Sequence, residues 1–148
     1  SFCYTRLMED SVFTKIIKGE IPCDKIYEDE KTIAFLTIEP YVEGHTLVVP
    51  KVQVDKFYDL SAEDSKALFT TVKKVARHLE KIAEAKRVVE MIYGFDVPHA
   101  HVHLIPVQDT TKYTEAFRRH LTHEKPYPYA PSKEELAAVA EKYKIEEK

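Results

Sequence analysis

The sequence predicts an α+β fold, in which a single antiparallel sheet of about five strands packs against one long amphipathic helix with short helices beside it. Two observations support this prediction. Short runs rich in β-branched residues recur along the chain, and one segment among them has apolar residues at spacings of three and four. Strands grouped around one long helix, rather than alternating with many helices, are typical of α+β proteins.

Length and composition fit one globular domain, since 148 residues can bury a core and 44% hydrophobic with 32% charged residues is ordinary. A formal net charge of −3 disfavours a dedicated nucleic-acid binder, which usually carries a basic surface. No apolar run reaches membrane-spanning length and the N-terminus lacks a signal-peptide pattern, so no membrane partner is expected. Cys3 and Cys23 do not form a disulfide framework, which favours a reducing, cytoplasmic location.

The first predicted elements are a short helix and a hairpin. The helix starts near Val12 and ends at Gly19. Its apolar residues are Phe13, Ile16 and Ile17. Residues 24–28 and 32–38 are strand-like runs joined by the polar sequence Glu-Asp-Glu-Lys, which predicts an antiparallel hairpin.

The central part of the chain combines two further strands with the long helix. Residues 45–49 are apolar and end at Pro50, and residues 87–93 are a β-branched and aromatic run. Between them Ser61, with an acid three residues later, resembles a capping box that starts a helix ending near Ala85. The apolar residues of this helix are Leu68, Val72, Val75, Leu79 and Ile82. Their spacing buries one face of the helix.

The run from Val97 to Val107 holds the residues most suggestive of chemistry. Three histidines, His99, His101 and His103, alternate with the aliphatic residues Ala100, Val102 and Leu104. On a strand this alternation places the imidazoles on one face and the aliphatic groups on the other, toward the core. Pro98 and Pro106 bracket the run, so a short strand between the two prolines is expected.

Histidine neither favours strands nor is cheap to bury, so three on one face require a reason beyond packing. A solvated strand face is one interpretation, although it would usually hold Thr, Lys or Glu. A metal site is another, but at a rise of about 3.3 Å per residue His99 and His103 lie roughly 13 Å apart, which is far for one ion. The third interpretation is phosphate chemistry, with a neutral imidazole as nucleophile and its neighbours as donors to phosphate oxygens.

The sequence HAHVHLI at residues 99–105 resembles the signature of the histidine triad (HIT) family, three histidines separated by single apolar residues with two apolar residues following. Residues 12–30, 32–51 and 96–106 are similar to the family's opening segment, central strands and catalytic strand, in that order. The triad together with GHTLVVPK at residues 44–51 is a specific signal. The resemblance implies a HIT-like fold and a two-fold homodimer. It places a HIT domain at residues 11–109, after an N-terminal extension (1–10) and before a C-terminal extension with a terminal helix (110–148).

The resemblance also implies roles for individual residues. His101 is expected to be the nucleophile, neutral and with its second nitrogen held by a backbone carbonyl of the triad segment. His103 and a protonated His99 are expected to donate to phosphate oxygens. His45 is expected to bond a triad imidazole and to orient His99 or relay protons to it. The expected nucleotide-binding residues, with an apolar slot for the base, are Phe13, Ile16, Phe35, Thr37, Ile38, Gly94 and Asp96.

The chain departs from the family pattern near the expected phosphate and ribose sites. Thr37 stands where the family has a ribose-binding acid, and a hydroxyl is not the double acceptor that a carboxylate is, so Glu39 is an alternative. Asp96 stands where a Ser or Thr often donates to phosphate, and an ionised carboxylate cannot donate. The glycine-rich loop before the triad is shortened, so that only Gly94 matches.

In the C-terminal extension, the sequence predicts two helices joined by a Pro- and Tyr-rich segment at residues 124–131. The first helix covers residues 110–123, and the second opens at Ser132, which has an acid three residues later. His120 and His123 have no spacing that indicates a site. They are interpreted as surface residues.

Three functions remain open. The leading one is a nucleotide hydrolase or nucleotidyl transferase that acts at the α-phosphate of a purine phosphoramidate or dinucleoside polyphosphate through a nucleotidyl-histidine intermediate. The second is a nucleotide-binding adaptor with weak or vestigial catalysis, motivated by Thr37, Asp96 and the short loop. The third is a zinc protein, which is disfavoured because the CxxC cysteines of bacterial and archaeal relatives correspond to Ser11 and Thr14. We therefore expect no metal and no other cofactor.

Overall fold

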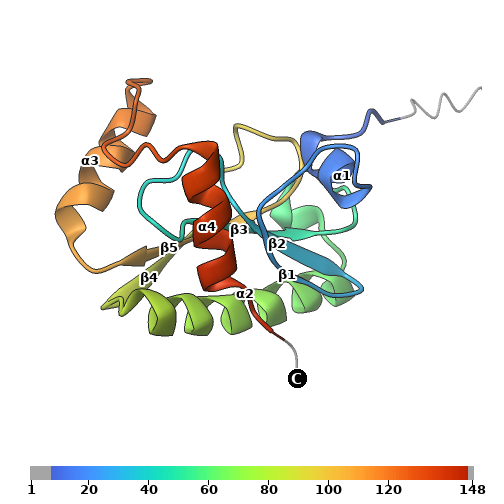
Figure 1. Ribbon diagram of the computed structural model, residues 1–148. Helices are drawn as coiled ribbons and strands as arrows, with labels where there is room; N and C mark the ends of the chain where they lie inside the picture. Colours follow the sequence, from blue (N-terminus) through green and yellow to red (C-terminus); the bar gives the residue numbers. More distant parts are fainter. Residues whose placement is uncertain (1–7, 147–148) are drawn as a thin grey trace, which may run out of the picture.

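The computed structural model of the chain describes residues 8–146, so the first seven residues of the predicted N-terminal extension lie outside the described residues. Five strands form one antiparallel sheet in the order β1-β2-β3-β5-β4. The strands are β1 (Lys25–Glu28), β2 (Thr32–Leu36), β3 (Thr46–Pro50), β4 (Arg87–Met91) and β5 (Val102–Val107). The predicted α+β fold with a five-stranded antiparallel sheet is confirmed (Figure 1).

One face of the sheet is covered by the long helix α2 (Ala62–Ala83), which packs against β2, β3, β4 and β5. As predicted, Ser61 caps the helix, because its Oγ accepts a hydrogen bond from the backbone N–H of Asp64 (3.1 Å). The predicted apolar stripe is buried from Leu68 to Leu79. Glu84, in the left-handed region with φ of 51°, ends the helix. Within the described chain, no helix is both long and apolar enough to cross a membrane.

The terminal helix α4 (Lys133–Tyr143) belongs to the same core as α2. Ser132 caps it through the backbone N–H of Glu135 (3.1 Å), as the capping-box pattern predicts. Four of its side chains enter the core shared with α2 and the sheet: Leu136, Val139, Ala140 and Tyr143. The imidazole of His78 in α2 donates to the carbonyl of Tyr143 (2.8 Å). The C-terminal extension is therefore built into the domain.

The opposite face of the sheet is covered by two separate elements (Figure 1). The helix α1 (Val12–Ile17) lies beside β2 and β3, where Phe13 joins a buried apolar cluster with Phe35. The helix α3 (Thr110–Leu121) lies over β4 and β5 and contributes to a second cluster. The buried members of this second cluster are Tyr41, Ile105, Val107, Ala116 and Tyr127. A single-turn helix, η1 (Phe57–Asp59), precedes α2.

The triad strand starts later than predicted. The strand was expected between the two prolines, but β5 begins at Val102 and contains Pro106. Before this point the backbone N–H of Ala100 donates to the carbonyl of Val54 (2.7 Å), so the segment bonds to a loop rather than to a strand. Pro106 is tolerated because β3 pairs with residues 102–104, and Pro106 lies beyond them. The aliphatic residues Val102 and Leu104 face the core, as predicted.

Candidate active site

Four histidines meet where β3 and β5 lie side by side. His45 immediately precedes β3, His103 lies within β5, and His99 and His101 are in the segment before β5. Leu47 of β3 pairs with His103, which places the His45 and His103 side chains on the same face of the sheet. The imidazole of His103 lies 5.2 Å, between ring centroids, from those of His45 and His101. His45, His99 and His101 are buried.

His101 is held in one tautomer by its own segment. Its Nδ1 lies 2.6 Å from the carbonyl oxygen of His99. Because a carbonyl can only accept, Nδ1 carries the hydrogen and the lone pair of the neutral ring is on Nε2. Burial lowers the pKa of His101, which favours this neutral form. The hydrogen bond to a backbone carbonyl of the triad segment, predicted from the sequence, is present.

His103 is oriented by a chain of two hydrogen bonds. The backbone N–H of Tyr41 donates to Nδ1 of His45 (3.0 Å), so a neutral His45 carries its hydrogen on Nε2. That nitrogen lies 2.9 Å from Nδ1 of His103, which must accept, and the hydrogen of His103 is therefore on Nε2. Burial lowers the pKa of His45 well below its usual value and that of His103 to about 3. The neutral forms that this chain requires are thus favoured.

The Nε2–H group of His103 is a buried donor without an acceptor among residues 8–146. An unpaired buried donor is costly, which makes this group a candidate donor to a bound ligand. The arrangement also corrects one expectation, since His45 bonds His103 and not His99.

His99 is fully buried and uses both ring nitrogens within the protein. Its Nε2–H donates to the carbonyl of Pro50 (2.8 Å), and its Nδ1 accepts from the hydroxyl of Ser11 (2.7 Å). Burial lowers the pKa of His99, which favours the neutral ring. His99 therefore has no free N–H for a phosphate. This corrects the expectation of a protonated His99 that donates to phosphate oxygens.

Ser11, Thr14 and Gln53 form a network around His99 that sequence reasoning did not assign to the site. Ser11 caps α1, since its Oγ accepts from the backbone N–H of Thr14 (3.0 Å). The amide oxygen of Gln53 accepts from the backbone N–H of Ser11 (2.8 Å) and from the hydroxyl of Thr14 (2.5 Å). The N-cap pattern of Ser11 is a sequence signal, whereas nothing in the sequence marks Gln53. Among residues 8–146, no three His, Cys, Asp or Glu side chains are grouped to hold a metal ion.

An apolar cluster lies beside His101. The Phe13 ring contacts His101 edge-on with centroids 4.9 Å apart, and the Phe35 ring is 5.6 Å from Phe13. Ile16 packs at the border of this cluster. The structure thus brings together three of the residues expected in the base pocket. Ile38 is not in this cluster, because β2 ends at Leu36 and the Ile38 side chain is 83% exposed.

The remaining predicted residues lie in two loops. Thr37 donates its backbone N–H to the carbonyl of His45 (3.2 Å), and its hydroxyl oxygen accepts from the backbone N–H of Glu39 (3.2 Å). The Glu39 carboxylate is ion-paired with Lys125. Gly94 and Asp96 are exposed in the loop between β4 and the triad. Asp96 opposes the lowering of the His101 pKa, so its charge acts at the expected nucleophile.

Comparison with known proteins identifies the family of this chain. Residues 18–110 match the model of the HIT domain. The chain is 39% identical over 103 residues to Protein hit of Bacillus subtilis (strain 168), covering 66% of this chain and 71% of that protein. It is 34% identical over 109 residues to the purine nucleoside phosphoramidase of Escherichia coli (strain K12), covering 67% of this chain and 88% of that protein. The structure of a Hit-like protein from Bartonella henselae superposes with a TM-score of 0.73 at 28% identity, covering 90% of this chain and 94% of that one. The chain therefore belongs to the HIT family.

Proposed function

We propose that this HIT enzyme hydrolyses a purine nucleoside phosphoramidate at its phosphorus, with dinucleoside polyphosphates as a second substrate class. The observation that carries the proposal is the pairing of an unprotonated Nε2 on His101 with an unpaired Nε2–H on the adjacent His103. A nucleophile and a donor to phosphate oxygens are the two groups that such a reaction requires. The E. coli relative named a purine nucleoside phosphoramidase supports the substrate class.

The reaction proceeds in two steps. First, the Nε2 lone pair of His101 bonds to the α-phosphorus, and the P–N bond breaks with its electron pair leaving on the amine, which takes up a proton from solvent. The ring gains positive charge, which the carbonyl of His99 at Nδ1 stabilises. Second, water bonds to phosphorus as the P–Nε2 bond breaks. This step yields a nucleoside monophosphate, one proton and neutral His101.

His103 donates its Nε2–H to a non-bridging phosphate oxygen as negative charge develops there. Because His45 and the Tyr41 backbone fix the orientation of the ring, the donor needs no reorganisation during the reaction. His99 is a positioning residue in this scheme. It ties the triad segment to Pro50 and to Ser11 at the start of α1.

The base packs against the apolar cluster of Phe13, Ile16 and Phe35, which lies next to the nucleophile. Thr37 keeps its hydroxyl hydrogen for a ribose hydroxyl, since its oxygen already accepts from the Glu39 backbone. Ile38 and Gly94 border the nucleotide from the adjoining loops. Such a mixture of apolar walls and a few polar groups is typical of ligand sites.

The enzyme forms a two-fold homodimer in a reducing, cytoplasmic setting under this proposal. β4 is an edge strand of the sheet, and Ile92 and Phe95, which follow it, are exposed. An edge strand beside exposed apolar residues is suited to pairing with a second copy. Sedimentation at micromolar concentration measures this, and a purely monomeric species would rule the dimer out.

Hydrolysis of adenosine 5′-phosphoramidate, followed by chromatography of the products, tests the proposed reaction. His101→Asn keeps an amide N–H near the position of the imidazole Nδ1–H but removes the nucleophile. We expect turnover to fall by at least about 10³-fold, while binding of AMP changes little. The alternative, a nucleotide-binding adaptor, is suggested by the Asp96 carboxylate near the site. It predicts that the wild type binds AMP without measurable turnover.

A further inference from the structure

The helix α3 carries a histidine, His120, toward the histidines of the site. The His120 side chain is only 18% exposed, and its Nε2 lies 3.8 Å from Oδ2 of Asp96. Its Nδ1 lies 3.0 Å from the hydroxyl of Tyr127, and its ring meets the Tyr93 ring edge-on at 4.9 Å. The Tyr41 ring lies between this group and His45, at 5.9 Å from His120 and 4.8 Å from His45. The interpretation of His120 as a surface residue is therefore wrong.

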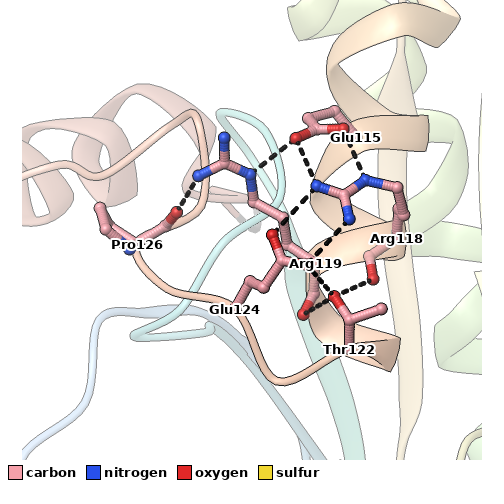
Figure 2. Close-up of polar contacts among 6 residues, drawn as sticks. All are labelled: Glu115, Arg118, Arg119, Thr122, Glu124 and Pro126. Atoms are coloured by element: carbon pink, nitrogen blue, oxygen red, sulfur yellow. Dashed lines mark hydrogen bonds and ion pairs between the residues drawn. The ribbon is translucent and has the colours of Figure 1, made fainter.

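An ion-pair network fixes the end of α3 that holds His120 (Figure 2). The Glu115 carboxylate accepts from Arg118 (3.0 Å) and from Arg119 (2.7 Å). Arg118 also binds Glu124, and Arg119 donates to the carbonyl of Pro126 (2.7 Å). Single exposed ion pairs add little stability, but this network joins the helix to the segment that leads into the buried Tyr127. His120 is thus held between helix α3 and the segment that leads into Tyr127.

The carboxylate of Asp96 is expected to repel an anionic substrate. Its carboxylate lies in the loop that leads into the triad and raises the pKa of His101, against the effect of burial. A phosphate that approaches His101 therefore meets a like charge. Asp96 also helps to raise the pKa of Lys125, but the Lys125 ammonium group is ion-paired with Glu39. Among the described residues, His120 is the side chain in ion-pair range of Asp96, and it carries a positive charge when protonated.

We propose that protonated His120 is a further positioning residue of this site, which neutralises Asp96 so that an anionic nucleotide phosphate can dock over His101. The inference rests on the proposed function. In the protonated ring both nitrogens donate, Nδ1–H to the Tyr127 hydroxyl and Nε2–H toward the Asp96 carboxylate. The residue lies beyond position 110, where the match to the HIT domain ends, so the C-terminal extension supplies it.

The charge of His120 also favours the neutral forms of the neighbouring histidines. It lowers the pKa values of His45 and His103, because a like charge disfavours their protonation. The neutral hydrogen-bond chain that orients His103 is thereby favoured. One cation on α3 thus acts on both the substrate charge and the donor geometry.

AMP binding measured by calorimetry at pH 6 tests the inference. His120→Gln keeps an N–H donor but removes the charge, so we expect the Kd to rise about fivefold. Adding Asp96→Asn to His120→Gln removes the carboxylate that repels the phosphate of AMP. The Kd of the double variant should therefore return to within about twofold of the wild-type Kd. A structural defect at α3 would not be rescued in this way. An unchanged Kd in His120→Gln, or a double variant as weak as the single one, would overturn the inference.

His123→Asn is the matched control. His123 is exposed just beyond α3 with φ of 57°, a backbone conformation that asparagine tolerates. We expect its AMP affinity and thermal midpoint to equal those of the wild type. If His120→Gln hydrolyses the phosphoramidate with the same KM and kcat as the wild type, only the role of His120 is contradicted. A wild type that neither binds AMP nor hydrolyses the phosphoramidate would overturn the proposed function as well.

Discussion

His101 and His103 are two residues apart, yet their hydrogen bonds require opposite tautomers. The carbonyl of His99 places the hydrogen of His101 on Nδ1, whereas the donor from His45 places that of His103 on Nε2. One ring is thereby prepared to attack phosphorus and the other to donate to its oxygens. The difference arises from the groups around each ring, since the two residues are chemically identical.

His45→Leu should allow the His103 hydrogen to move to Nδ1, because no donor would then occupy that nitrogen. With the Nε2–H lost for part of the time, we expect kcat to fall about 10- to 100-fold with a smaller change in KM. The ¹⁵N chemical shifts of the imidazoles report the tautomers directly. His45→Gln, whose amide can still donate to His103, is the control. Identical tautomers for His101 and His103 in the wild type would contradict this part of the mechanism.

The four histidines of the site could be identified from the sequence, but their partners could not. An alternating pattern fixes which side chains share a face only where the strand is continuous, and β5 begins after His101. His99 therefore lies in irregular backbone, where it meets Ser11, a residue 88 positions earlier in the chain. Contacts at such separations depend on how the elements pack, and no local pattern records them.

At the scale of elements, local signals predicted most of the fold. The caps at Ser61 and Ser132 were predicted from residue type and spacing, because an N-cap requires only a side-chain oxygen near the first turn. The position of α3 over β4 and β5 could not be predicted in this way. It depends on the packing of Ala116 and Tyr127 against Tyr41, which lies far from both in the sequence. This packing brings His120 to the site.

At the scale of the whole molecule, the buried histidines predict how stability depends on pH. Burial lowers the folded-state pKa values of His45, His99, His101 and His103, whereas in the unfolded chain they return to about 6.5. Below that pH the unfolded chain binds protons that the folded chain does not. The stability contribution is therefore present above about pH 6.5 and is lost as the pH falls toward the folded-state values.

Urea unfolding at pH 7.0 and pH 5.5 measures this dependence. We expect the free energy of unfolding to be lower at pH 5.5 by about 2–4 kcal/mol, since each neutral histidine contributes up to about 1.4 kcal/mol per pH unit. His45→Leu should reduce the slope by about one proton, and His123→Asn should leave it unchanged. A free energy that is constant or rises toward pH 5.5 would show that the buried histidines are protonated in the folded state.

The mechanism depends on a covalent bond between Nε2 of His101 and phosphorus. The most direct measurement is rapid acid-free quenching of the enzyme with radiolabelled adenosine 5′-phosphoramidate, followed by mass spectrometry of the labelled peptide. A phosphorus–nitrogen bond to imidazole is labile in acid and stable in base, so we expect a label with these properties on His101 in the wild type and none in His101→Asn. A label that persists without His101, or turnover that proceeds with no label on the wild type under single-turnover conditions, would contradict it.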